Sequence, residues 1–321
     1  MAKQKAAVNA HYRRLSLGQK IARDFSHNKY KYLMILPVLV YLALFCYKPM
    51  YGIQIAFKNY KITRGIEKSA WAGMYWFEQF FNDPYFWRLL RNTFLISGLQ
   101  ILFCFPAPIL LALMLNEVQH NRFKRTVQTI TYMPYFISLV VLCSLVKIYT
   151  QQNGLVSEIV AFFGGTKQNW LQDPKYYRLV YILSDIWQSV GWNSIIYLAA
   201  LSGIDMEQYE AARIDGASRF QQMLHVTLPG LLPTITILFI LRMGSILNVG
   251  YEKTLLLYQP TTYEVADIFS TYTYRISLGA TSGQPQYSLS TAVSLFNTIV
   301  NVFFLLLTNF ISRRATDSSL F

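Results

Sequence analysis

The chain has 321 residues, and its composition is 53% hydrophobic, 16% aromatic and only 14% charged. Soluble globular domains carry roughly 25% charged residues, so this composition argues against a soluble multidomain enzyme and indicates that lipid is the solvent for much of the chain. The formal net charge of +13 is dispersed between apolar runs and forms no recognisable nucleic-acid-binding module. We therefore expect membrane lipid, with its anionic headgroups, as a partner, and no nucleic acid.

Six apolar segments of roughly 20 residues, the length that crosses the hydrocarbon core of a bilayer, follow one another along the chain. An even number of spans places both termini on the same side. The segments on that side carry more Lys and Arg than the opposite ones, and such an excess marks the cytoplasm. The pattern predicts an all-α, multi-pass membrane protein with six transmembrane helices, at residues 32–57, 93–115, 130–149, 179–201, 231–250 and 289–311.

The predicted domains follow from these spans. Residues 1–31 are rich in Lys and Arg and are expected to form a cytoplasmic N-terminal tail. A six-helix transmembrane domain is expected over residues 32–311, and a cytoplasmic C-terminal tail over residues 312–321. Apolar residues set among the basic ones of the N-terminal tail fit an amphipathic helix at the membrane surface. A disordered tail fits them equally well.

The polar segment between the fourth and fifth spans, residues 205–230, is rich in helix signals. Asp205 together with Gln208 resembles a capping box, which predicts the start of a helix. Gly216 is placed to end that helix in a left-handed conformation. This part of the segment is therefore predicted to be a short helix outside the bilayer.

A second short helix is predicted directly afterwards. Ser218 and Gln221 have the spacing of another capping box, and Pro229 and Pro233 are expected to end this helix and start the next span. The small residues of the first helix leave a low-profile surface, which suits a helix seated in a groove of another protein. We interpret residues 205–230 as a docking element and call them the coupling segment.

The coupling segment also carries a family resemblance. Glu210-Ala211-Ala212, three residues, Gly216, nine residues and then Val226-Thr227-Leu228-Pro229 resembles the EAA loop of permease subunits of binding-protein-dependent ABC importers, with valine in place of the commoner isoleucine. Other stretches resemble the sugar-permease branch with the maltose-type permease fold: Arg91-Asn92-Thr93, Met133-Pro134-Tyr135, Trp170-Leu171-Gln172-Asp173-Pro174, and the stretch from Trp187 to Trp192. The resemblance covers nearly the whole chain and implies a type I ABC importer permease fold in a bacterial plasma membrane.

In this family the loop is a coupling helix that sits on a cytoplasmic ATPase. The resemblance therefore implies that the residues that couple to the ATPase are Glu210, Ala211, Ala212, Asp215, Gly216, Leu228 and Pro229. It also implies three kinds of partner: a second, related permease that completes a heterodimer, cytoplasmic ATP-binding subunits, and an extracellular solute-binding protein.

The chain itself is expected to be a transport subunit and not an enzyme. It contains no Gly-x-x-x-x-Gly-Lys-Ser/Thr stretch to bind the phosphates of ATP, so ATP and Mg²⁺ are expected on the partner ATPase. No catalytic constellation is recognisable, because the four histidines lie in tails or loops. The three cysteines lie in apolar runs without metal-ligand spacing, so neither a metal nor a cofactor is expected.

Polar residues within spans are costly in lipid and therefore indicate what a helix face lines. Helical spacing places polar residues on one face of the fourth span and one face of the fifth, and the maltose-type resemblance points to Ser189, Trp192, Arg242 and Ile246. The predicted substrate pathway comprises Asp185, Gln188, Ser189, Trp192, Asn193, Arg242, Ser245, Asn248 and Glu252. The alternative is structural: Asp185 and Arg242 form an ion pair between packed helices, and Gln188 and Asn248 hydrogen-bond across them. Lys253 is expected to snorkel to the membrane surface.

A cationic Arg242 within the membrane suits an anionic solute, because guanidinium pairs with carboxylate in a bidentate manner. The basic tail and the segment Tyr47-Lys48-Pro49-Met50-Tyr51-Gly52 resemble the lipo-/polysaccharide permease subgroup. This resemblance implies uptake of acidic, uronate-containing saccharides derived from pectin or alginate. The alternative function is a secondary transporter driven by an ion gradient, which the intramembrane Asp185 and Glu252 suggest.

Overall fold

The computed structural model describes residues 17–278 and 283–315. Within these ranges the secondary structure is helical, and the one extended pairing is an isolated antiparallel bridge between Lys58 and Trp71. The prediction of an all-α protein is therefore confirmed. The parts of the predicted tails before position 17 and after position 315 lie outside the described residues.

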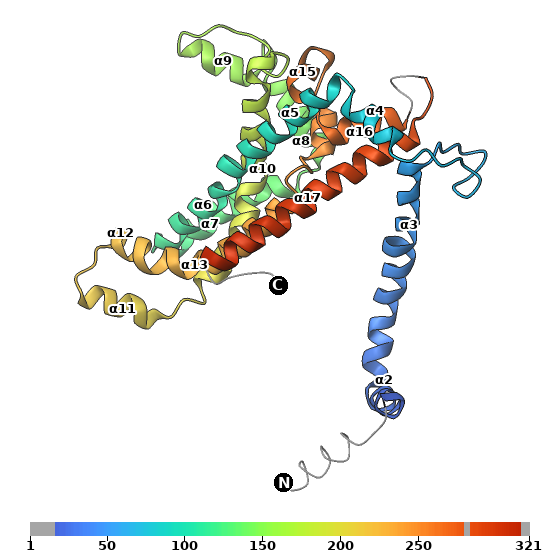
Figure 1. Ribbon diagram of the computed structural model, residues 1–321. Coiled ribbons are helices and arrows are strands. Elements are labelled where there is room, and N and C mark those ends of the chain that lie inside the picture. Colours follow the sequence, from blue (N-terminus) through green and yellow to red (C-terminus); the bar gives the residue numbers. More distant parts are fainter. Residues whose placement is uncertain (1–16, 279–282, 316–321) are drawn as a thin grey trace.

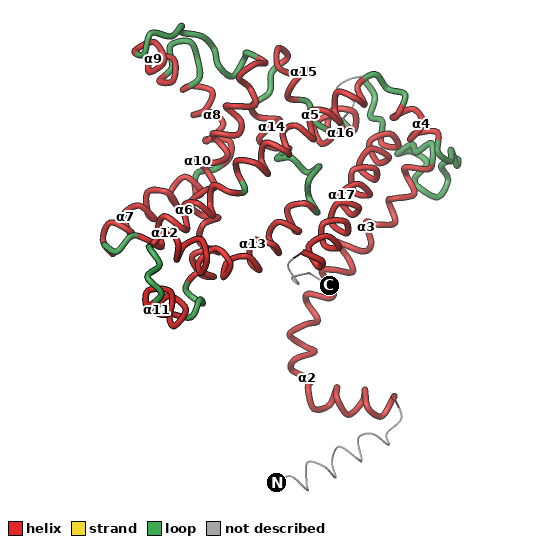
Figure 2. Tube along the Cα trace, turned by 60° about the vertical axis from the view of Figure 1, so that its left-hand side comes forward, coloured by secondary structure: helices red, strands yellow, loops and turns green. Residues whose placement is uncertain are grey.

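The first predicted span is a long helix that stands apart from the other helices (Figures 1 and 2). It comprises α2 (Leu17–Tyr41), a π-helical turn, α3 (Lys48–Met50) and a 3-10 turn. The apolar window within Asp24–Phe57 is 0% buried, and the 3-10 turn packs against α17 (Tyr287–Ala315). The backbone of α2 leaves helical geometry at Asn28, so the first turns of α2 run at an angle to the rest of the span (Figure 2).

Several helical stretches are suited to a membrane, but the number of spans stays a prediction. α10 (Pro174–Leu201) contains the fourth predicted span and is long enough to cross, although its polar residues make it less apolar than the other candidates. Among the described residues, the stretches that are both long and apolar enough are Asp24–Phe57, Tyr85–Glu117, Arg219–Met243 and Tyr287–Arg314.

The second predicted span contains a widened turn. α5 (Tyr85–Leu99) continues through a π-helical turn, Gln100–Cys104, into α6 (Pro106–Glu117). Pro106 has no N–H, and its ring obstructs the carbonyl four residues earlier, so the backbone shifts to a longer hydrogen bond from the Phe105 N–H to the Gln100 carbonyl, 2.9 Å. Gln100, at the start of this turn, is buried between helices.

The third predicted span is not one straight helix. α7 (Asn121–Tyr132) and the 3-10 turn after it meet α8 (Leu139–Tyr149) at an angle of 101°. The break has a local cause, because the Ser138 side chain accepts a hydrogen bond from the Val141 N–H (3.4 Å) and so starts a new helix. The prediction of a single helix over residues 130–149 is therefore wrong.

The fifth predicted span is shifted toward the N-terminus. α13 (Leu228–Met243) ends seven residues before Gly250, and the chain then runs without helix to α14 (Tyr251–Leu257). Asn301 of α17 accepts the N–H of Leu247 at 2.9 Å, which replaces a helical hydrogen bond. The predicted span of residues 231–250 is therefore wrong at its end.

The remaining helices gather at the two ends of the molecule (Figure 1). The lower end in this view carries α11 (Met206–Ile214), α12 (Arg219–Gln222), the start of α2 and the end of α17. The core lies between the two ends, where α10 packs against α6, α7 and α13. Both described ends of the chain thus lie on the side of the coupling segment. The helices at the opposite end are α4 (Tyr75–Phe81), α9 (Leu155–Phe162), α15 (Tyr263–Ala266) and α16 (Phe269–Ser277).

Candidate coupling segment and transport cavity

The coupling segment begins with α11 (Met206–Ile214), which is capped by Asp205. The Asp205 carboxylate accepts a hydrogen bond from the N–H of Glu207 at 3.0 Å. The predicted cap is therefore present, but the predicted box with Gln208 is not formed. The reason is geometric: the short aspartate side chain reaches the N–H two residues on, and Gln208 instead bonds through its N–H to the Asp205 carbonyl, 3.3 Å.

The break after α11 agrees with its prediction. Gly216 has a φ of +78°, the left-handed region that glycine adopts without cost from a Cβ atom. Beyond it, the Ser218 N–H donates to the Gln221 side chain at 2.7 Å and the Gln221 N–H donates to the Ser218 hydroxyl at 3.4 Å. These two bonds form the predicted capping box of α12 (Arg219–Gln222).

The end of the second helix differs from its prediction. α12 passes through a π-helical turn, Met223–Thr227, directly into α13, so that Arg219–Met243 is one continuous helix. The N–H of Leu228 bonds to the Met223 carbonyl across this widened turn. A π-turn accommodates the missing N–H of Pro229 without ending the helix, and so the prediction that Pro229 and Pro233 stop it is wrong.

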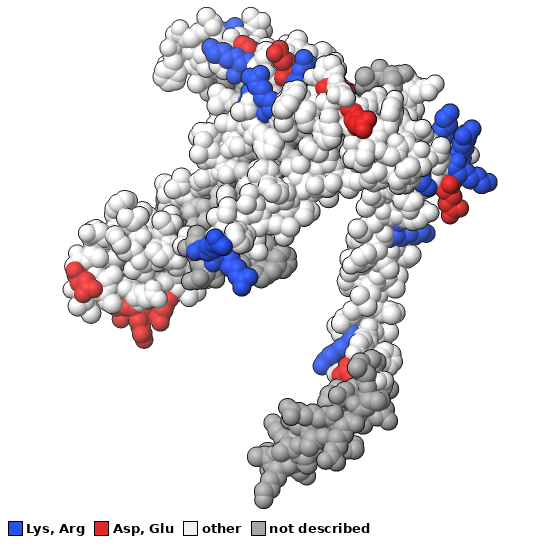
Figure 3. Space-filling view, viewed as in Figure 1, with Lys and Arg blue, Asp and Glu red and all other residues white. Residues whose placement is uncertain are grey.

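The surface of the coupling segment is largely exposed. Glu210, Ala211, Asp215, Gly216 and Pro229 are exposed, while Ala212 and Leu228 are half-buried. Acidic side chains form a patch at this lower end of the molecule (Figure 3). The structure adds three apolar side chains that the sequence analysis missed and that are 62%, 87% and 67% exposed: Met206, Ile214 and Phe220. Their signal was available, since large apolar residues in a polar loop mark contact surfaces.

The coupling segment is tied to the membrane helix that follows it. The hydroxyls of Tyr209, on α11, and Thr227, in the π-turn, lie 3.0 Å apart. Ile204, just before α11, packs against Gly230 of α13, where a Cβ atom would lie 2.6 Å from its side chain. Direct contacts therefore link α11 and the residue before it to the π-turn and the start of α13.

Between α6, α10 and α13 lies a cavity of about 540 Å³, which we call the Arg242 cavity. Six of the nine predicted pathway residues line it: Asp185, Ser189, Asn193, Arg242, Ser245 and Asn248. Although the chain leaves its helix at Gly244, Ser245 and Asn248 still reach the cavity, because the segment after α13 folds back along its wall.

Three predicted pathway residues do not line the Arg242 cavity. Gln188 is half-buried elsewhere on α10, and Glu252 is exposed at the start of α14, off the helix predicted to carry it. The Trp192 ring stacks on Tyr135, with ring centres 4.7 Å apart and planes 6° from parallel. Helical spacing fails here because Glu252 belongs to another helix. The resemblance-based position Ile246 is buried in an apolar cluster.

The Asp185 carboxylate is paired within the protein. Its partner is Lys253 of α14, whose Nζ lies 3.2 Å from Asp185 Oδ1. Lys253 is only 4% exposed and also donates to the Tyr181 carbonyl at 3.2 Å. The expectation that Lys253 snorkels to the surface is therefore wrong: a buried lysine requires a partner, and Asp185 supplies it.

Gln100 connects the two charged groups of the cavity. It donates from Nε2 to Asp185 Oδ2 at 3.2 Å, and it accepts from Arg242 Nη2 at 2.6 Å. The direct Asp185–Arg242 ion pair of the structural alternative is therefore not formed, and Asn248 pairs with Asn297 of α17 at 3.0 Å and not with Gln188. Gln100 was missed, although a glutamine inside the second apolar span was a signal.

These features define a class of protein: a helical membrane subunit with a polar cavity between its helices and an exposed docking segment at one end. Residues 105–317 match the family described as "Binding-protein-dependent transport system inner membrane component", and the chain belongs to this family. It is thus a multi-pass membrane component of such a transport system. This membership favours the ATP-driven transport hypothesis over the ion-gradient alternative.

Individual relatives are similar over nearly their whole length. The chain is 42% identical to Protein LplB of Bacillus subtilis (strain 168), covering 92% of each chain. It is also 42% identical to the polygalacturonan/rhamnogalacturonan transport system permease protein YteP of the same organism, covering 99% of this chain and 98% of YteP. A crystal structure of a bacterial ABC transporter involved in the import of the acidic polysaccharide alginate contains a chain 41% identical, with a TM-score of 0.83, over 92% of this chain and 99% of that one.

Proposed function

We propose that this chain is the translocation subunit of an ATP-driven importer of acidic, uronate-containing saccharides. Both the YteP name and the alginate transporter concern acidic polysaccharides, and the chemistry of the Arg242 cavity agrees with them. A bacterial alginate ABC transporter, which contains a chain 41% identical to this one, has been solved in complex with a periplasmic protein that carries an alginate pentasaccharide. A solute-binding protein that delivers the saccharide is therefore the extracellular partner we expect.

The observation that carries the substrate class is the separation of charges in the Arg242 cavity. Asp185 is neutralised by Lys253, and Arg242 is held by the uncharged amide of Gln100. Among the described residues no carboxylate forms a salt bridge with Arg242. Its positive charge is therefore available to a solute, and a low-dielectric cavity strengthens the attraction for a carboxylate.

The coupling segment is proposed to dock on a partner ATPase. Large apolar side chains such as the exposed ones of Met206, Ile214 and Phe220 are typical of protein interfaces. The contacts of Tyr209 and Ile204 connect the segment with the π-turn and α13. ATP hydrolysis on the partner would thus move a helix that lines the Arg242 cavity. A second, related permease subunit is the membrane partner we expect.

The substrate proposal is tested by changing the charge of Arg242. The importer, with its second permease, ATPase subunits and binding protein, is reconstituted in proteoliposomes, and uptake of trigalacturonate and of a neutral galactose trisaccharide is measured. Arg242→Gln is expected to lower trigalacturonate uptake about 10- to 100-fold, since a hydrogen bond to a charged group contributes about 1.5–3 kcal/mol, and to change neutral uptake less than twofold.

Two further variants sharpen this test. Arg242→Lys keeps the charge but loses the bidentate geometry, so its trigalacturonate uptake should be intermediate. The control is Gln188→Ala. Gln188 lies on the same helix as Asp185 but outside the cavity, so uptake of both trisaccharides by this variant should match that of the wild type. An equal reduction of acidic and neutral uptake by Arg242→Gln contradicts the carboxylate-pairing role.

A further inference from the structure

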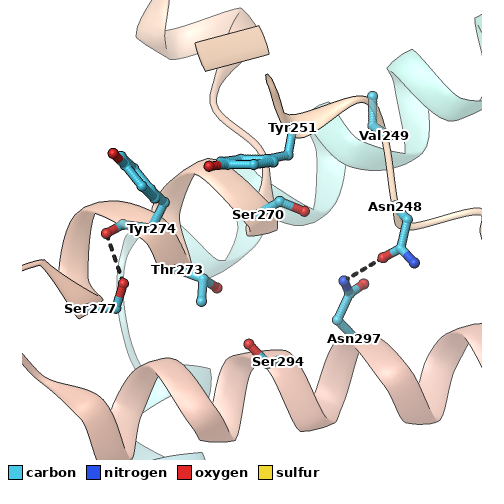
Figure 4. A pocket seen from close by; sticks show the side chains of 9 residues that line it. All are labelled: Asn248, Val249, Tyr251, Ser270, Thr273, Tyr274, Ser277, Ser294 and Asn297. Carbon is cyan, nitrogen blue, oxygen red and sulfur yellow. Dashed lines mark hydrogen bonds between the residues drawn. The ribbon is translucent and has the colours of Figure 1, made fainter. Parts of the chain in front are cut away.

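A second cavity adjoins the Arg242 cavity, and we call it the neutral cavity. It has a volume of about 510 Å³ and lies between α14, α16, α17 and the segment after α13. Figure 4 shows its lining residues: Asn248, Val249, Tyr251, Ser270, Thr273, Tyr274, Ser277, Ser294 and Asn297. Asn248 lines both cavities. The next residue, Val249, lines the neutral cavity, and Gly250 after it lines the Arg242 cavity. The two cavities therefore meet at this segment.

The lining of the neutral cavity differs in chemistry from that of its neighbour. All its side chains except Val249 carry a hydroxyl or an amide, and none of them is charged. Such groups donate and accept hydrogen bonds but offer no charge for a carboxylate. The rings of Tyr251 and Tyr274 lie 5.7 Å apart at one end (Figure 4). A pocket of aromatic rings with a few convergent polar groups is a common form of small-molecule site.

Several polar groups of this lining have no partner within the described chain. Elsewhere on α17, the hydroxyls of Ser290, Thr291 and Thr298 donate to carbonyls of their own helix, as serine and threonine hydroxyls in helices commonly do. In contrast, five lining hydroxyls have no hydrogen bond within the described residues: those of Tyr251, Ser270, Thr273, Tyr274 and Ser294. Tyr274 and Ser294 are exposed, and the other three residues are half-buried.

Asn297, which is half-buried, shows the same feature at its side-chain oxygen. Its Nδ2 donates to Asn248 Oδ1 at 3.0 Å, as Figure 4 shows, whereas its Oδ1 is buried without a hydrogen-bond partner in the described chain. A buried acceptor without a donor costs about 1–3 kcal/mol, and such groups are satisfied by water or by a ligand. A hydroxyl-bearing ligand would supply the missing donor.

We propose that the neutral cavity is a saccharide subsite that binds the hydroxyl groups of a sugar unit, while the Arg242 cavity holds the carboxylate of a neighbouring unit. This proposal rests on the proposed function and deepens it. It assigns sugar recognition to Ser270, Thr273, Ser294 and Asn297, on two helices that follow the fifth span. An oligosaccharide of several units, and not a single sugar, is the ligand that fills both cavities.

The test removes three hydroxyls with little change of shape, in the variant Ser270→Ala/Thr273→Val/Ser294→Ala. Binding of tetragalacturonate is measured by equilibrium dialysis on the purified importer without its solute-binding protein, so that only membrane sites contribute. Each lost hydrogen bond contributes about 0.5–1.5 kcal/mol, so the dissociation constant should rise about tenfold or more. The control, Thr291→Val/Thr298→Val, removes hydroxyls that are bonded within α17 and should leave the dissociation constant unchanged.

The outcomes separate this proposal from the proposed function. An unchanged dissociation constant in the triple variant overturns the subsite, while uptake of tetragalacturonate by the wild-type importer leaves the proposed function in place. A wild-type importer that neither binds nor takes up tetragalacturonate overturns both. If the triple variant misfolds, Asn297→Leu is tested alone, because leucine fills the position of the unpartnered acceptor. This variant must show the same loss of tetragalacturonate binding. Wild-type binding by a correctly folded N297L protein overturns the subsite.

Discussion

The coupling segment and the Arg242 cavity are built in opposite ways. The coupling segment is formed by residues close in sequence, and its caps and its left-handed glycine are local features. The Arg242 cavity depends on three lining residues and one buried partner from four separate helical segments: Gln100, Asp185 and Arg242, with Lys253 behind Asp185. A local element tolerates little change in its backbone, whereas a cavity of this kind depends on charge balance between distant residues. The two regions should therefore respond differently to substitution.

The largest effect is expected in the coupling segment at Gly216. Gly216→Val places a β-branched residue at a φ of +78°, a conformation in which such a residue is strained, so the turn between α11 and α12 should change shape. We expect ATP-driven uptake to be lost while the protein still inserts in the membrane. Uptake in proteoliposomes and membrane-fraction levels measure the two properties separately.

A matched glycine provides the control for that variant. Gly98, within α5, has helical geometry and no atom within 4 Å of the position of an added Cβ, so Gly98→Ala should transport like the wild type. Full ATP-coupled uptake by the Gly216→Val protein would show that the turn has no role in docking.

A smaller effect is expected at Lys253, the buried partner of the cavity residue Asp185. Lys253→Met removes the partner of Asp185 and leaves a carboxylate that is 26% exposed beside an apolar side chain. Removing one partner of a buried pair costs about 3–5 kcal/mol. Because Gln100 still donates to Asp185, the lower end, about 3 kcal/mol, is expected. The free energy of unfolding in detergent is the measurement.

The double variant tests whether charge is the cause. Lys253→Met/Asp185→Asn removes both charges and should recover most of the lost stability, since replacement of a whole buried pair is often nearly neutral. If the double variant is as unstable as Lys253→Met, the loss comes from packing around Lys253 and not from the unpaired carboxylate.

The sequence predicted the local features and missed the long-range ones, for physical reasons. Gly216 and the Ser218 box were predictable because a capping signal involves residues within four positions of one another. The continuation of the helix through Pro229 was not, since a π-turn absorbs the missing N–H and leaves no sequence mark. The end of α13 depends on Asn301, which is far away in sequence.

The Arg242 cavity shows more clearly that long-range contacts could not be predicted from the sequence. Helical periodicity identified Asp185 and Arg242, because polar residues in apolar spans are unusual. It could not supply their partners, since Gln100 and Lys253 reach them only through the packing of α10 with the π-helical turn after α5 and with α14. The prediction that Lys253 snorkels to the membrane surface was wrong because α14, which carries it, packs inside the fold and not at the membrane surface. Polar residues in different spans therefore have to be considered as candidate partners of one another.

The most direct test of the account is the energy source of uptake. The reconstituted importer, loaded with ATP and treated with ionophores that abolish proton and sodium gradients, is assayed for uptake of trigalacturonate delivered by its binding protein. We predict that uptake persists and depends on the ATPase subunits. Uptake that continues without any ATPase and collapses with the ion gradient would contradict the account.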